Sequence, residues 1–479
     1  MTASGPDRLP TASPSGAAGR HGRAVVLGGS LAGLLAAAAL ATRFAEVTIV
    51  DRDPLDVPLD APRRGVPQGR HTHGLLVGGM RAMEELLPGL TEALVRRGGR
   101  DVDVVERARW HLGGGSLARF PSGLTCLLAS RTLIESEVRA RVLALAGIRV
   151  LGGHDIVGLL ASDDGRRVTG ARLAVRAAAA TPPDAAVAPV EVLADLVVDA
   201  TGRGSRAPGW LAELGHPEPA ETVVDADICY VTRQFRTAPG VLDDLDADVI
   251  GSTPPDPRSG VALRQEDGRW SVTLAGGHGL QPPTELDAFT AYATELPTPG
   301  LARIAARCEP IGEPLVYRYP NSRWRRWEKV GSRPAGLVIV GDAVCSFNPI
   351  YGQGMSSAAL QARELSRLVA DGLDDLPRRA AEAFAAVVAV PWTLATGGDL
   401  RYPGQPAKSL PERVLDRYLD RLVRVARTDE RVALAFFQVL NLLAAPSTLM
   451  GPAVLGRVLR PRGHFRLKGG YRSVTRRIA

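Results

Sequence analysis

The chain has little cysteine for its length, four residues in 479. They are far apart, at Cys126, Cys229, Cys308 and Cys345, and no Cys-x-x-Cys pair occurs. This spacing argues against a zinc ribbon and a disulfide framework. We interpret Cys345 as a buried structural thiol and expect a cytoplasmic protein, because such cysteine usage fits a reducing compartment.

Long apolar runs are also missing. No uninterrupted apolar stretch reaches the length of a membrane-spanning helix. The first twenty residues are rich in Ser, Pro, Gly and Ala but lack the apolar segment of a signal peptide. We therefore interpret residues 1–22 as a disordered leader and expect no transmembrane segment.

Lysine is scarce as well, so the net charge of +7 comes almost wholly from arginine. The arginines are interleaved with acidic residues, which is typical of a solvated surface, and we expect no nucleic-acid partner. Two basic runs, at 323–329 and from Arg457 onward, contain aromatic residues. They leave a peripheral membrane contact open.

What the sequence does have is a glycine turn between a strand and a helix. An apolar strand at 24–27 precedes Gly-Gly-Ser-Leu-Ala-Gly, and an alanine-rich helix and a strand ending at Asp51 follow. This order is typical of the start of a Rossmann-type domain. Ser30 replaces the glycine that lets backbone approach a pyrophosphate, but the context and the Asp51 carboxylate favour a dinucleotide without a 2′-phosphate over a turn without a ligand.

A second glycine turn follows another apolar strand, at 336–340. It begins with Gly341 and Asp342, passes Pro349 and opens a predicted helix through Gly-Gln-Gly at 352–354. Free amides at a helix start attract negative charge, so this arrangement can hold a polar group against the backbone. Asp342 is either a turn aspartate or a ligand of that group. Together the two turns predict one cofactor bound at both ends.

The pattern Gly-Asp-x(6)-Pro-x-x-Gly-Gln-Gly at 341–354, with the turn at 28–33 and Arg131, resembles the FAD-dependent monooxygenases of the para-hydroxybenzoate hydroxylase fold. In element order the resemblance covers about the whole chain. The loop Arg-Gly-Val-Pro-Gln-Gly-Arg-His-Thr-His at 64–73 is similar to one in actinobacterial secondary-metabolism members such as polyether polyketide epoxidases. That similarity implies a place in antibiotic biosynthesis.

The resemblance implies that FAD binds in an extended form. It places the adenosine ribose at Asp51 and Arg52, the ribityl chain at Asp342, and Pro349 beside the ring where oxygen reacts. The amides at 352–355 would lie at the pyrimidine edge of the ring. The implied cofactor residues are Gly28, Gly29, Ser30, Leu31, Ala32, Gly33, Asp51, Arg52, Gly65, Val66, Arg131, Val157, Gly341, Asp342, Pro349, Gly352, Gln353, Gly354 and Met355.

The remaining pattern completes a mixed α/β (α+β) fold. We predict helices over Met80–Gly98 and Ser130–Ala146 and a three-strand antiparallel meander over 149–192. The predicted organisation is a Rossmann-type FAD-binding domain, an inserted, mostly antiparallel substrate sheet and a C-terminal helical region. The FAD-binding domain comprises residues 23–210 and 331–375, the substrate sheet residues 211–330, and the helical region residues 376–479.

By resemblance the protein is a monooxygenase that inserts one oxygen atom from O2, through a flavin C4a-hydroperoxide, into an apolar polyketide or isoprenoid intermediate by epoxidation or hydroxylation. Two alternatives stay open: a flavin-dependent reductase of isoprenoid double bonds, and an FAD-binding cyclase or scaffold without redox turnover. Halogenation is disfavoured because Gly-Trp-x-Trp-x-Ile-Pro is absent. No catalytic residue of the substrate pocket is identified.

The electron source also stays open. Family members that use NADPH carry adjacent Asp and Gly in the region that here reads Asp199-Ala-Thr-Gly202. The separation leaves either NAD(P)H or a separate flavin reductase as the donor. His71 and His73 alternate along an extended segment, so one could face the cofactor and the other solvent. Their roles stay open between structural, cofactor-orienting and catalytic, and no third ligand nearby indicates a metal site.

Overall fold

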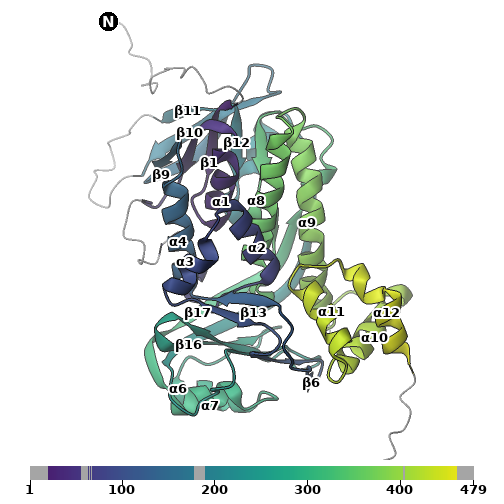
Figure 1. Ribbon diagram of the computed structural model, residues 1–479. Coiled ribbons are helices and arrows are strands. Elements are labelled where there is room, and N and C mark those ends of the chain that lie inside the picture. Colours follow the sequence, from purple (N-terminus) through teal and green to yellow (C-terminus); the bar gives the residue numbers. More distant parts are fainter. Residues whose placement is uncertain are drawn as a thin grey trace, which may run out of the picture.

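The computed structural model describes residues 20–55, 63, 65, 67–176, 189–402 and 405–460. Most of the predicted leader, residues 1–19, lies outside these described residues, and so does Val66 of the predicted cofactor site. The predicted fold class is confirmed, since parallel and antiparallel sheets combine with a helical C-terminal region (Figure 1).

The first sheet is parallel, and its strand order brings both glycine turns together. The order is β18-β12-β1-β2-β8. The turn after β1 and the turn after β18 therefore lie on either side of β12, at the edge where carboxyl ends of parallel strands meet and ligands bind. The strands are β1 His21–Leu27, β2 Phe44–Val50, β8 Ile148–Leu151, β12 Leu196–Asp199 and β18 Leu337–Ile339.

Helices cover this sheet and bury its apolar strands (Figure 1). The first helix is apolar on all sides, as expected of a fully enclosed helix, and packs against both α4 and α8. The longest helix, α9, packs on α8 and β18. The helices are α1 Leu31–Ala41, α2 Val77–Leu86, α3 Leu90–Arg96, α4 Arg131–Leu143, α5 Ala207–Glu213, α8 Gly354–Ala370 and α9 Leu376–Asp399.

The predicted single helix over Met80–Gly98 is wrong, because two helices, α2 and α3, occupy this range. Pro88 separates them, and the following Gly89 has a φ of +78°. Proline lacks the N–H that would continue the ladder, and a left-handed residue turns the chain out of the helix. The predicted helix over Ser130–Ala146 is confirmed as α4, with Ser130 as its N-cap.

An eight-stranded, mostly antiparallel sheet forms the lower layer in Figure 1. Alternate side chains of β16 separate its faces: Trp270, Val272 and Leu274 pack with the helices α6 Leu286–Thr294 and α7 Gly300–Arg307, whereas Thr273 and Ala275 face the other way. In order, the strands are β19 Cys345–Ser346, β17 Glu309–Arg325, β13 Glu221–Arg236, β16 Arg269–Gly276, β15 Ser259–Gln265, β14 Ala247–Ile250, β5 Ala108–Leu112 and β6 Gly115–Ser116.

This sheet extends beyond the predicted substrate segment 211–330 at both of its edges, through β19 on one side and β5 with β6 on the other. Two three-stranded sheets complete the fold. The predicted meander is confirmed as β9 His154–Ala161, β10 Val168–Val175 and β11 Val190–Leu193. The other comprises β3 Gly74–Leu75, β7 Thr125–Leu128 and β4 Arg100–Asp103.

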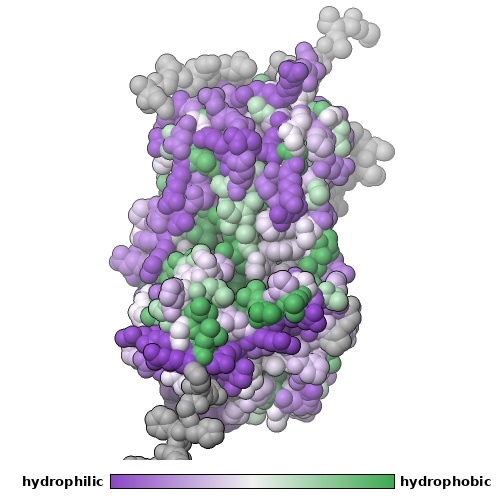
Figure 2. Space-filling view, turned by 90° about the vertical axis from the view of Figure 1, so that its right-hand side faces the viewer, coloured by the Kyte–Doolittle hydropathy of each residue, from purple (hydrophilic) through white to green (hydrophobic). Residues whose placement is uncertain are grey.

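The C-terminal helices α10 Leu410–Val425, α11 Glu430–Leu440 and α12 Pro452–Leu459 form a lobe beside β5 and β6 (Figure 1). On the face shown in Figure 2, hydrophobic residues gather above a strongly hydrophilic band. Exposed apolar residues of this lobe include Leu410, Val414, Leu415, Met450 and Leu459. Among the described residues, α9 alone is long and apolar enough to cross a membrane.

Candidate active site

A cavity of about 760 Å³ lies between the parallel sheet and the eight-stranded sheet. Both glycine turns border it, as the sequence predicted. Gly29, Gly33, Gly341 and Gln353 do not line it. The predicted cofactor residues that do are Gly28, Ser30, Leu31, Ala32, Asp51, Arg52, Gly65, Arg131, Val157, Asp342, Pro349, Gly352, Gly354 and Met355.

The first turn fits closely between β1 and α1. Gly28 has a φ of +101°, which favours glycine, and a Cβ on Gly33 would lie 1.7 Å from the Gly28 carbonyl oxygen. Both glycines are therefore required by the turn itself. The first N–H groups of α1 have no acceptor within the helix, and the Ser30 side chain does not cap them. They make the start of α1 attractive to an anion.

Asp51 is held by hydrogen bonds at the end of β2. Its carboxylate accepts from Gly29 N at 2.6 Å and from Asp53 N at 2.8 Å. Arg63, which the sequence did not single out, lies 2.8 Å from both Asp51 and Glu135. Burial opposes the charge of the Arg63 guanidinium, but these two carboxylates raise its pKa above the usual value. Arg63 thus fixes Asp51 at the cavity wall.

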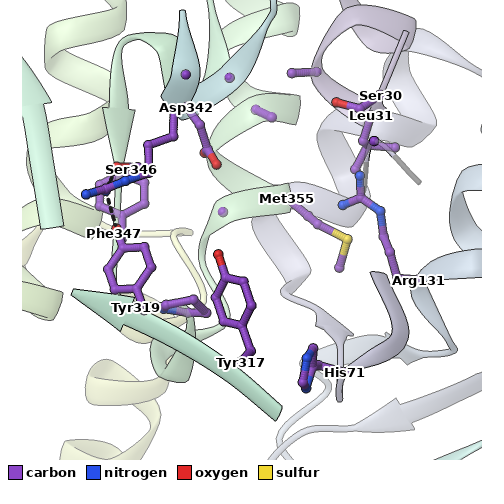
Figure 3. A pocket seen from close by; sticks show the side chains of 18 of the residues that line it. Ser30, Leu31, His71, Arg131, Tyr317, Tyr319, Asp342, Ser346, Phe347 and Met355 are labelled. Atoms are coloured by element: carbon purple, nitrogen blue, oxygen red, sulfur yellow. Dashed lines mark hydrogen bonds between the residues drawn. The ribbon is translucent and has the colours of Figure 1, made fainter. Parts of the chain in front are cut away.

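The second turn presents a carboxylate without a partner. Gly341 has a φ of +68°, and its N–H donates to Gln361 at 2.9 Å. The next side chain, Asp342, points into the cavity (Figure 3) and accepts no hydrogen bond from the described residues. Loss of hydration at the cavity wall raises the pKa of the Asp342 carboxyl above its ordinary value. The positive charges of Arg131 and Arg203 act in the opposite direction.

The start of α8 leaves room at the backbone. A Cβ on Gly352 or Gly354 would meet nothing within 4 Å, and the N-cap Gln353 makes no side-chain cap. The Gln353 side-chain amide is buried and has no hydrogen-bond partner in the part of the chain that the structure describes. The N-termini of α1 and α8 therefore both border one cavity, and the Arg131 guanidinium lies near Leu31 at the start of α1 (Figure 3).

Arg203 is a further cavity residue that sequence reasoning missed. It lies in the short 3-10 helix Gly202–Gly204 after β12 and donates to the Ser346 hydroxyl at 2.6 Å and the Tyr319 hydroxyl at 3.2 Å. Its guanidinium also lies over the Tyr319 ring, 5.0 Å from the centroid. These contacts join the segment after Asp199 to the loop after β18.

A buried network fixes the loop that carries Pro349. The Asn348 side chain accepts from the Tyr230 hydroxyl at 2.5 Å and donates to Asp399 at 3.1 Å. The Tyr351 hydroxyl donates to the same carboxylate at 3.3 Å. Burial raises the pKa of Asp399 to about 6. Asp399 is the last residue of α9, so the end of that helix determines where Pro349 lies.

The opposite wall of the cavity is uncharged. None of its residues from β13, β15, β16 and β17 is ionised at neutral pH, and Tyr230 and Tyr317 stack with ring centroids 6.3 Å apart. His71 and His73 both line the cavity, so the expected arrangement with only one of them facing the cofactor site is not seen, and both are half-buried. Burial lowers the pKa of each to about 4, assisted by Arg70 at His71 and Arg131 at His73. Both rings are therefore neutral at pH 7.

The chain matches no family model. Protein Rv3254 of Mycobacterium tuberculosis (strain ATCC 25618 / H37Rv) is 33% identical over 461 residues, which cover 91% of this chain and 93% of the relative. The chain belongs to the family of Rv3254.

Solved structures of other proteins share the fold of this Rv3254 relative. The flavin-dependent brominase Bmp2 matches with a TM-score of 0.60 at 15% identity, over 87% of this chain and 92% of Bmp2. PqsL of Pseudomonas aeruginosa, a probable FAD-dependent monooxygenase, matches with a TM-score of 0.56 at 18% identity, over 79% of this chain and 97% of PqsL. The resemblance drawn from the two glycine turns is thus confirmed at the level of the fold.

Proposed function

We propose that this protein is an FAD-dependent monooxygenase that transfers one oxygen atom from O2 to a neutral, largely apolar organic molecule. The observation that carries this proposal is the pairing of two open helix starts and the unpartnered Asp342 carboxylate around one cavity. The fold shared with flavin-dependent oxidoreductases supports it.

The described residues fit FAD at both ends. A pyrophosphate suits the free amides of α1, and the Arg52 and Arg131 side chains add positive charge. Ribityl hydroxyls are donors, which is what the Asp342 carboxylate lacks. A flavin ring needs bare backbone close by, and the open space at Gly352 and Gly354 is of that kind. The volume of the cavity lies within the range of ligand pockets.

Bound FAD would supply the redox chemistry, because its reduced ring can pass electrons to O2 for oxygen transfer. The protein would position the flavin ring and stabilise the charge that develops on it. The N–H groups and dipole at the start of α8 would stabilise negative charge on the pyrimidine edge, and the Asp399 network would hold Pro349 against the ring. The uncharged, largely aromatic and aliphatic wall would limit the access of water to the reacting face.

Epoxidation of an alkene and hydroxylation of an activated ring both remain within this proposal. Epoxidation needs no base to activate the substrate, which suits a wall without a charged residue among those described on β13, β15, β16 and β17. A polyketide or isoprenoid intermediate is the substrate class we propose. The electron donor is NAD(P)H or a separate flavin reductase, and a peripheral membrane contact stays a prediction.

Matched polyenes test this function. We expect the purified, FAD-containing protein, reduced with NADPH or photochemically, to consume O2 with formation of an oxygenated product when retinol is present. Retinoic acid should give a much smaller effect, because its carboxylate would be buried against an uncharged wall. Product formation without O2 would instead support the reductase alternative. Turnover that is indifferent to the flavin redox state would support a cyclase or scaffold, and a protein that cannot take up FAD would contradict the proposal.

A further inference from the structure

Six side chains form an unbranched hydrogen-bonded chain at the uncharged wall of the cavity. The order is Gln234, Ser271, Thr72, Thr273, Thr232 and His71, with successive distances of 2.9, 2.7, 2.7, 2.6 and 2.8 Å. Ser271 and Thr232 are fully buried, so water does not compete for their hydroxyls. The chain begins on the sheet and ends at the Nδ1 atom of His71.

The donor at one end sets the direction of every bond. The Gln234 Nε2 group can only donate, so the Ser271 oxygen accepts from it. Each hydroxyl has a single proton, and one proton must lie in each bond. Ser271 therefore donates to Thr72, Thr72 to Thr273, Thr273 to Thr232, and Thr232 to His71. The Nδ1 atom of His71 is an acceptor in this arrangement.

An accepting Nδ1 places the ring proton of neutral His71 on Nε2. The Nε2 atom has no hydrogen-bond partner among the described residues, and His71 lines the cavity. Its ring lies 5.6 Å from the Tyr317 ring (Figure 3). A donor with no acceptor among the described residues thus faces a wall that is otherwise aromatic, aliphatic or hydroxyl-bearing.

His73 has the opposite tautomer. Its Nδ1 lies 2.9 Å from the His71 carbonyl oxygen, which can only accept, so the His73 proton is on Nδ1. The Gln234 chain does not reach His73. Different hydrogen bonds therefore set the tautomers of the two neighbouring imidazoles. His73 is an internal reference for His71.

We propose that the Nε2–H of His71 is the substrate-binding donor of the cavity and selects a neutral molecule with an acceptor oxygen, such as a carbonyl, ether or hydroxyl group, beside its apolar body. Gln234 and the four hydroxyl residues are positioning residues that fix this donor. In naming the ligand a substrate, the inference rests on the proposed function.

The tautomer of His71 tests the chain without any turnover. In [15N]histidine-labelled protein at pH 8, assigned with the His71→Phe variant, we expect the proton on Nε2 at His71 and on Nδ1 at His73. Gln234→Glu replaces the terminal donor by an acceptor and should reverse the chain, moving the His71 proton to Nδ1 and leaving His73 unchanged. Thr232→Val should leave His71 with both tautomers populated, whereas Thr290→Val, away from the chain on α6, should change neither ring.

Affinity for a matched pair of probes tests the donor. We expect 2-acetylnaphthalene to bind the FAD-containing protein about fivefold more tightly than 2-ethylnaphthalene, since one added hydrogen bond contributes about 1 kcal/mol. Gln234→Glu should reduce this preference to less than twofold. Wild-type His71 with its proton on Nδ1, or equal affinities for the two probes, would overturn the inference. Neither measurement depends on oxygen transfer, so failure of the proposed function is seen separately.

Discussion

Asp399 shows how one buried residue can connect a distant helix to the cavity. It is 5% exposed, and its carboxylate is contacted by Asn348 and Tyr351. No arginine or lysine pairs with it among the described residues. Burial therefore dominates, and the pKa of Asp399 rises from 3.8 to about 6.

This raised pKa predicts a pH-dependent free energy of unfolding. Between pH 4 and pH 6 the folded protein binds a proton at Asp399 that the unfolded chain releases, so the contribution of this group falls as pH rises. Asp399→Asn keeps the shape but does not titrate. We expect the variant to gain stability relative to wild type by about 2 kcal/mol as pH rises from 4.5 to 7.5, out of about 3 kcal/mol for the full shift.

Chemical denaturation of both proteins at several pH values measures this difference. Asp371→Asn, an exposed position after α8, is the matched control and should show no such trend. Parallel stability curves for wild type and Asp399→Asn would contradict the burial argument. The sequence alone did not reveal Asp399, since nothing in the apolar pattern of α9 tells which residue meets Asn348.

At the scale of elements, the glycine turns were predictable because their backbone needs are local. A strand, a tight turn and an apolar helix follow one another within a few residues, and Gly33 is required by contact with Gly28. The break at Pro88 was missed although a proline marks it, because the apolar spacing continues on both sides. Arg63 and Arg203 were missed for another reason: their partners are far away in the sequence.

Gly33→Ala tests the packing of α1 against β1. The added methyl group would collide with the Gly28 carbonyl, so α1 and its turn must shift. We expect a loss of about 1–3 kcal/mol or more in the free energy of unfolding, together with weaker retention of FAD. Thermal unfolding and the flavin-to-protein absorbance ratio measure both effects.

Gly456→Ala is the matched control on another helix. Gly456 is exposed within α12, and a Cβ there would meet nothing within 4 Å. Alanine should stabilise this helix by roughly 0.5–1 kcal/mol and leave FAD retention unchanged. If Gly33→Ala instead raised stability and left FAD retention unchanged, as expected for Gly456→Ala, the result would contradict the close contact between α1 and the turn at Gly28.

At the scale of the whole molecule, the cavity exists only where two sheets meet. The sequence predicted both sheets and the two glycine turns that border the cavity, because glycine turns have recognisable spacing. It did not predict the uncharged wall, whose residues come from β13, β15, β16 and β17 and follow no spacing rule. Their side chains come together through long-range pairing, which sequence order does not reveal.

A ligand that contacts both glycine turns should stabilise the protein more than a smaller ligand that contacts only one of them. For FAD at a hundred times its Kd the gain is about 2.7 kcal/mol, or roughly 3 °C in Tm if this chain unfolds as one unit. In the proposed site ADP would reach only the first turn and FMN only the second. We therefore expect FAD to raise the Tm of the apoprotein, and equal concentrations of ADP or FMN to have much smaller effects.

Differential scanning calorimetry of the apoprotein with each ligand makes this comparison, because Tm should rise with the logarithm of FAD concentration. ADP and FMN added together test the need for a covalent link, since two separate ligands lose more translational freedom than one. Their joint shift should stay below that of FAD. An ADP shift equal to that of FAD would mean that only the start of α1 binds the cofactor, and it would contradict a site formed by both turns.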